Sequence, residues 1–125
     1  MSSYFISPPE ATTWTFDADT LARSLCTAWP AAHVERISDP SGIHALRWTI
    51  ESGLPARIEG TLAKDGQTVH LDGDLRAVVV VARWYRSVVP SQQALVFYDE
   101  GFSADVRLTA QVTEDQLAQP FLATT

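Results

Sequence analysis

The sequence predicts one α+β domain, an antiparallel sheet with helices in the order helix, three or four strands, long middle helix, hairpin, short helix. Turn residues divide the chain roughly every ten residues, and strand-like and helix-like apolar spacing alternates between them. The stretch Asp74–Pro90, DLRAVVVVARWYRSVVP, is apolar on most sides, so a sheet, a second subunit or both must cover it. A chain of 125 residues suffices for one core, and residues 1–125 are expected to form one domain.

The first helix is predicted over Asp17–Trp29. Asp17 has the position of an N-cap, and Phe16 and Leu21 are spaced to form a hydrophobic staple across the helix start. Cys26, the one cysteine, is expected on the buried face of this helix. It is interpreted as a core residue, because a reactive thiolate needs exposure and nearby positive charge.

A meander of strands is expected next, with one buried face and one face of mixed charge. Apolar and polar residues alternate in most of these segments, as in half-buried strands. The expected strands are His33–Ile37, Ala45–Glu51, Ala56–Ala63 and the segment around Val69 and Leu71. The turns between them are Asp39-Pro40-Ser41-Gly42 and Lys64-Asp65-Gly66. The segment Tyr4-Phe5-Ile6 is a candidate for a further strand of the same sheet.

The stretch Asp74–Pro90 could form a strand or a helix. Its four consecutive valines favour a strand, since β-branched side chains fit a pleated sheet. Its length exceeds the usual strand of about 5–6 residues, and Arg76, Arg83 and Ser87 share one helical stripe. With Asp74 as N-cap, a middle helix is therefore predicted over Asp74–Val89 and packed on one sheet face.

The C-terminal part predicts a hairpin and a short helix. Ala94–Tyr98 and Ser103–Thr109 are the two arms of the hairpin, around the turn Asp99-Glu100-Gly101. Thr113 and Gln116 have the spacing of a capping box, so a helix is expected over Thr113–Gln119, ended by Pro120.

Composition excludes some classes of function. A net charge of −6 disfavours a nucleic-acid partner, which requires clustered Lys and Arg. The longest apolar run, Ala77–Ala82, is far shorter than a membrane span, and the start MSSYFISPPE resembles no secretory signal. A cytoplasmic protein is expected. Eight Arg, one Lys and no Asn favour GC-rich codons, which is typical of some bacterial genomes.

Motifs for catalysis, cofactors or metals are missing from the sequence. It has no glycine-rich phosphate or dinucleotide motif and no nucleophile elbow, and its histidines lie apart: His33, His44 and His70. Two carboxylate pairs, Asp72/Asp74 and Asp99/Glu100, are more typical of a helix cap and a turn than of acid–base chemistry. No catalytic residue, cofactor or metal site is predicted, and an enzyme is not favoured.

Two groups of residues are predicted to recognise a partner. The first is the acidic, aromatic turn, where rings offer contact area and carboxylates can meet Arg or Lys. Its residues are Tyr98, Asp99, Glu100 and Phe102. The second is a basic patch on the middle helix, made of Arg76, Arg83, Trp84 and Arg86. A homodimer using Trp84 or Val88 is expected, because the apolar arc of this helix is wider than one sheet face requires.

The order of elements, with helices at Asp17–Trp29, Asp74–Val89 and Thr113–Gln119, resembles the type III secretion chaperone-like fold family. Members are small, often acidic α+β proteins, and many of them dimerise to bind a segment of a partner. Bacterial immunity proteins are similar in size and acidity. The resemblance implies a non-enzymatic protein-binding domain, chaperone-like or immunity-like. The alternative is a small-ligand-binding domain or weak hydrolase with a pocket between sheet and middle helix.

Overall fold

A computed structural model describes residues 2–38 and 40–122, and in them the predicted α+β fold is confirmed. The sheet is made of β1 (Ser2–Ser7), β2 (His33–Arg36), β3 (His44–Ile50), β4 (Ile58–Ala63), β5 (Val69–Gly73), β6 (Val96–Asp99) and β7 (Asp105–Arg107). The helices of these ranges are α1 (Ala18–Ala28), α2 (Leu75–Val88) and α3 (Glu114–Leu122). Asp39, the first residue of a predicted turn, lies outside the described residues.

The N-terminal strand β1 lies inside the sheet rather than at its edge. The strand order is β2-β3-β4-β5-β1-β6-β7, and every neighbouring pair is antiparallel. Strand β1 therefore joins the meander β2–β5 to the hairpin β6–β7. The sequence indicated an added strand around Tyr4-Phe5-Ile6 but not its central place.

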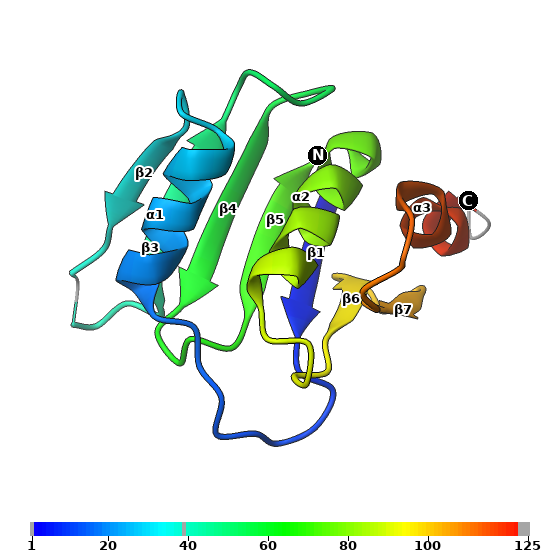
Figure 1. Ribbon diagram of the computed structural model, residues 1–125, viewed down its shortest axis with the longest axis horizontal. Helices are drawn as coiled ribbons and strands as arrows, with labels where there is room; N and C mark the ends of the chain where they lie inside the picture. The colour runs from blue at the N-terminus through cyan, green and yellow to red at the C-terminus, as the bar shows by residue number, and fades with distance from the viewer. Residues whose placement is uncertain (1, 39, 123–125) are drawn as a thin grey trace.

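The helices lie on one face of the sheet (Figure 1). Helix α1 contacts β2 and β3, helix α2 contacts β5 and β1, and helix α3 contacts α2 and β7. Strand residues alternate accordingly: Tyr4 and Ile6 are buried under the helices, whereas Ser3, Phe5 and Ser7 face the other way. No described helix covers that second face, which we call the uncovered face.

Helix α1 begins as predicted, with Asp17 as N-cap and its carboxylate accepting from the Thr20 N–H at 3.0 Å. The expectation for Cys26 is wrong, since this residue is exposed. The buried face of α1 is narrow and consists of Leu21, Ala22 and Leu25. Cys26 follows directly on Leu25 and falls just outside this stripe.

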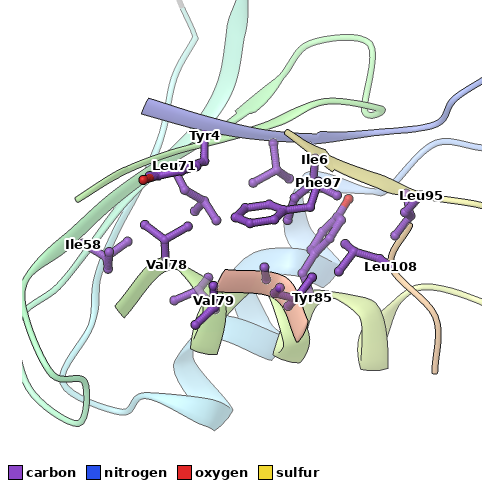
Figure 2. Close-up of a cluster of buried hydrophobic side chains, with 14 of the residues drawn as sticks. Tyr4, Ile6, Ile58, Leu71, Val78, Val79, Tyr85, Leu95, Phe97 and Leu108 are labelled. Carbon is purple, nitrogen blue, oxygen red and sulfur yellow. The ribbon is translucent and has the colours of Figure 1, made fainter. Parts of the chain in front are cut away.

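The middle segment is helical, as its polar spacing predicted. The Asp74 carboxylate accepts from the Arg76 N–H at 2.9 Å and caps α2. Val78, Val79 and Tyr85 of α2 point toward the sheet and fill the core beneath it (Figure 2).

Helix α3 begins with the predicted capping box but ends later than expected. The Thr113 hydroxyl accepts from the Gln116 N–H at 3.1 Å, and the Gln116 side chain accepts from the Thr113 N–H at 2.9 Å. The helix continues through Pro120 to Leu122, so the predicted end is wrong. Proline in the last turn removes only one helical hydrogen bond. The helical turn after it buries Phe121 edge-on against Tyr4 and Phe97.

The largest fully buried side chain, Trp48 in β3, depends on a glycine opposite it. Gly60 of β4 is its register partner, and a Cβ at Gly60 would lie 2.3 Å from the indole ring. Only a residue without a side chain leaves room for the ring at this position.

We expect Gly60→Ala to lower the free energy of unfolding by about 1–3 kcal/mol, because the added methyl overpacks the core against Trp48. Urea denaturation measures this loss. In a Trp48→Leu background, Gly60→Ala should lower the free energy of unfolding by less, because the indole ring that the added methyl would overlap is absent. Equal costs in both backgrounds would contradict the contact.

Candidate functional site

A continuous row of side chains crosses the uncovered face at one register level. Strand pairing places the members directly opposite one another across seven strands. In order they are Glu35, Arg47, Thr61, His70, Phe5, Tyr98 and Asp105. The centre of this row is aromatic and its ends are charged.

The central rings are stacked. The ring centroid of Phe5 lies 4.8 Å from that of His70 and 5.5 Å from that of Tyr98, with interplanar angles of 12° and 18°. Phe102, from the β6–β7 loop, stacks on the outer side of Tyr98 at 4.5 Å and 10°. We call His70, Phe5, Tyr98 and Phe102 the aromatic row. Its rings stand side by side and cover one another's faces.

Side-chain hydrogen bonds join β1 to the strands on either side of it, beside the aromatic row. The Ser7 and Tyr98 hydroxyls lie 3.0 Å apart, and the Ser3 hydroxyl donates to Asp72 Oδ1 at 2.5 Å. The same oxygen of Asp72 lies 3.2 Å from His70 Nε2. Ser7 therefore holds the Tyr98 ring, whereas His70 Nε2 has no hydrogen-bond partner among the described residues.

These polar groups do not form a nucleophile–base pair. The hydroxyl of Ser3 is bonded to the carboxylate of Asp72 and not to the imidazole of His70. A serine nucleophile needs a base that takes its proton, with the carboxylate behind that base. Asp74, the other predicted carboxylate of this pair, is occupied as the cap of α2.

Phe102 has an unusual backbone conformation. Its φ is +52°, in the left-handed region that a bulky residue rarely adopts, and 68% of the residue is exposed. The Asp99 carboxylate supports the loop by accepting from the N–H and the hydroxyl of Ser103. The Phe102 N–H donates to the Asp99 carbonyl at 3.0 Å.

The predicted turn contains one glycine, Gly101, yet the residue with positive φ in the loop is Phe102. Asp99 is also bound within the loop, and of the two acidic side chains only Glu100 is exposed without such a role. Strain at such a position costs on the order of 1–3 kcal/mol, which the ring stack and the Asp99 bonds offset.

The Asp99 carboxyl has a pKa below its usual range. Partial burial alone raises the pKa of Asp99, but the hydrogen bonds from the Ser103 hydroxyl and N–H favour the charged form and outweigh burial. The ionised carboxylate is thus the form that holds the loop.

The second predicted group, on α2, lies apart from the aromatic row and is engaged within the chain. Arg76 pairs with Asp115 of α3 at 3.3 Å, and Arg83 lies 3.9 Å from Glu114. These arginines attach the first turn of α3 to α2. They do not form a free basic patch.

Arg86 is buried, which the sequence did not indicate. Its guanidinium donates to the carbonyls of Val89 at 3.2 Å, Pro90 at 2.6 Å, Gln93 at 2.7 Å and Leu108 at 3.4 Å. Burial lowers the pKa of Arg86. Because Arg86 ties the chain after α2 to the segment after β7, its role is in the fold.

The side of α2 that suggested a dimer is covered only in part, since Trp84 and Val88 are half-buried. Trp84 packs edge-on against Trp29 at the end of α1, with centroids 5.0 Å apart, and α3 contacts the same helix. The sheet and these two helices cover part of the apolar arc of α2. The homodimer stays a prediction.

The space between the sheet and α2 is filled by packed side chains (Figure 2). A hollow of about 620 Å³ lies outside this space, beside Arg83, Trp84 and Thr109. Its charged walls, Arg83 and Glu114, face each other. Among the described residues, the space between the sheet and α2 therefore contains packed side chains where the hydrolase alternative expected a pocket.

Comparisons with known proteins give no family. No family model, curated protein or solved structure matches the chain. Within residues 2–38 and 40–122, no group of three or more His, Cys, Asp or Glu side chains could hold a metal ion. None of the helices in these ranges is long and apolar enough to cross a membrane.

We expect Arg86→Met to lower the free energy of unfolding by about 2–4 kcal/mol, because buried carbonyls lose their donors. Arg83→Met is the matched control on the same helix. Its exposed, long ion pair is worth at most about 1 kcal/mol. Urea unfolding of both variants measures the difference, and equal losses would contradict the role of Arg86.

Stacking of Phe102 on Tyr98 should depend on pH through Asp99. Since the folded-state pKa of Asp99 is lowered, its contribution to the loop is complete above the unfolded value of about 4 and is lost as pH falls below it. Ring-current shifts of the Tyr98 protons measure the stacking. In Asp99→Asn these shifts should not change with pH while helical circular dichroism is intact. A titration in that variant equal to the wild type would rule out Asp99 as the cause.

Proposed function

We propose that this protein is a non-enzymatic binding domain that engages a protein partner through the uncovered face of its sheet. The observation that carries the proposal is the aromatic row, four rings stacked across three strands and a loop, ending in the exposed Phe102. A chaperone-like or immunity-like role in the cytoplasm of a bacterium agrees with the small acidic chain.

Sheet stability alone does not account for this arrangement. Cross-strand pairs such as Phe5 and Tyr98 stabilise a sheet by about 0.2–1 kcal/mol each. This stabilisation is a sufficient explanation for aromatic rings that lie within strands. Phe102 lies outside the strands, adopts a strained conformation and exposes most of its surface. Such strain concentrates at sites of function, which favours a role in recognition.

A pre-arranged aromatic surface is well suited to protein contact. Aromatic side chains are enriched where binding energy concentrates, because they bury much area and lose little rotamer freedom. Here the stacking and the Ser7–Tyr98 hydrogen bond fix the rings in advance, so binding costs less ordering entropy. The small-ligand or hydrolase alternative has no comparable observation in its favour.

The test is site-specific photo-crosslinking in cells of the native host. Phe102 is replaced by p-benzoylphenylalanine, which keeps an aromatic ring at this position. Ile43, 71% exposed and on another loop, receives the same probe as the matched control. We expect one discrete protein adduct from position 102 and none of that mass from position 43.

Competition makes the test specific. An excess of unlabelled wild-type protein should abolish the adduct, whereas an excess of Phe102→Ala protein should not. An adduct with a second copy of the chain would identify a homodimer as the bound form. The proposal fails if position 102 gives no discrete adduct, if both positions give the same products, or if the Phe102→Ala protein competes equally.

A further inference from the structure

We infer that the partner places an arginine side chain against the outer face of Phe102, where Glu100 and Asp105 receive its guanidinium. This inference rests on the proposed function and adds the chemistry of the partner to it. It depends on which ring face is free, on which carboxylates are unpaired and on the charge of the hairpin.

At one end of the aromatic row Phe102 offers an exposed ring face, and at the other end His70 borders a small hollow lined by Arg47 and Thr61. Phe5 is covered by His70 on one side and by Tyr98 on the other, and Tyr98 is covered by Phe5 and Phe102. At the far end His70 lies beside Thr61 of β4. Phe102 stacks on Tyr98 with one face only, and 68% of the residue is exposed.

A cation is the group that a free ring face attracts. The face of an aromatic ring is electrostatically negative and its edge positive, so cations bind over the face and not along the edges. Phe102 is the exposed ring of the aromatic row, whereas Phe5, His70 and Tyr98 are half-buried, so the cation is placed at Phe102.

Two exposed carboxylates of the same hairpin have no partners in the described part of the chain. Asp105 of β7 is the register partner of Tyr98, on the same face of the sheet, and is exposed. Glu100 is exposed two residues before Phe102, and its N–H donates to the Ser3 carbonyl at 3.1 Å, which fixes its backbone. Neither side chain takes part in a hydrogen bond or ion pair among residues 2–38 and 40–122.

The charge around the loop is negative in spite of one nearby cation. The hairpin carries three carboxylates and Arg107, a net charge of −2, within a chain of net charge −6. Arg107 lies on the same strand and face as Asp105 but forms no ion pair with it in the described residues. Complementarity thus favours a basic partner, and it opposes a nucleic acid, whose phosphates would meet these carboxylates.

Arginine fits this place better than lysine. A planar guanidinium can lie flat on the Phe102 ring while its fork of N–H donors reaches carboxylates at the rim. A lysine ammonium is compact and strongly hydrated, so it makes the same contacts less well.

The experiment uses the full chain and three probe peptides, Gly-Ser-Gly-X-Gly-Ser-Gly, acetylated and amidated. X is arginine, lysine or citrulline, which has the shape of arginine without its charge. Amide shifts of residues 99–105 are followed by NMR at low salt up to about 10 mM peptide. We expect saturable shifts with arginine, at least threefold weaker binding with lysine and no shifts with citrulline.

Variants assign the binding to this site. Phe102→Leu should abolish the shifts, and Glu100→Gln with Asp105→Asn should weaken binding at least fivefold and remove its dependence on salt. Glu35→Gln, at the opposite edge of the same row, is the matched control and should bind as the wild type does. The inference is overturned if the arginine peptide causes no shifts or if the citrulline peptide causes equal shifts. It is also overturned if Phe102→Leu and the double variant bind the arginine peptide as the wild type does.

Failure here and failure of the proposed function are distinguishable. A discrete adduct from position 102 together with no arginine binding leaves the protein-binding role and rejects the arginine. Arginine binding without an adduct in the host cells supports the site chemistry and rejects the protein partner.

Discussion

The structure depends on the pairing of β1 between β5 and β6. Without this strand, the meander β2–β5 and the hairpin β6–β7 share no backbone hydrogen bonds in the sheet. Its alternating side chains serve both faces, with Tyr4 and Ile6 in the core and Phe5 between His70 and Tyr98 on the uncovered face. One strand thus completes the core and the candidate binding surface together. Because its partners lie far away in the sequence, its pairing has a high entropic cost of loop closure.

The charged residues of α2 and those of the β6–β7 hairpin have different roles in this fold. Those on α2 have partners within the chain: Arg76 and Arg83 form exposed ion pairs with the first turn of α3, and Arg86 donates to the carbonyls beyond the helix. Those of the β6–β7 hairpin point outward, except for Asp99, which stabilises the loop that carries Phe102. Three of the nine basic residues of the chain are engaged within the fold at α2, and acidic charge is left at the hairpin.

Local signals in the sequence predicted most of the fold. Asp17, Asp74 and the Thr113–Gln116 box cap the three helices as their spacing indicated, and the meander strands follow the period-2 pattern. The failures came where tertiary contacts override local preference. Pro120 stays helical because Phe121 is buried, and Arg86 is buried because four carbonyls surround it.

The candidate site was predictable only in part. Tyr98 and Phe102 are close in sequence and were recognised, but Phe5 and His70 come from distant segments that only strand register brings together. The left-handed conformation of Phe102 could not be predicted, since the residue directly before it is a glycine and the stack on Tyr98 forms only in the folded hairpin. A period-2 pattern predicts which residues share a face, but it does not predict which strands are neighbours.

The alternation along β1 has a consequence for how such chains diverge. A shift of one residue in its pairing would exchange the faces, moving Phe5 into the core and Tyr4 and Ile6 outward. The core positions of β1 thus fix the register on which the exposed positions depend. Substitutions at positions 3, 5 and 7 change the uncovered face, whereas Tyr4 and Ile6 must keep a size and shape that fill the core. The constraints of the core and those of the uncovered face therefore act on alternate residues of one short strand.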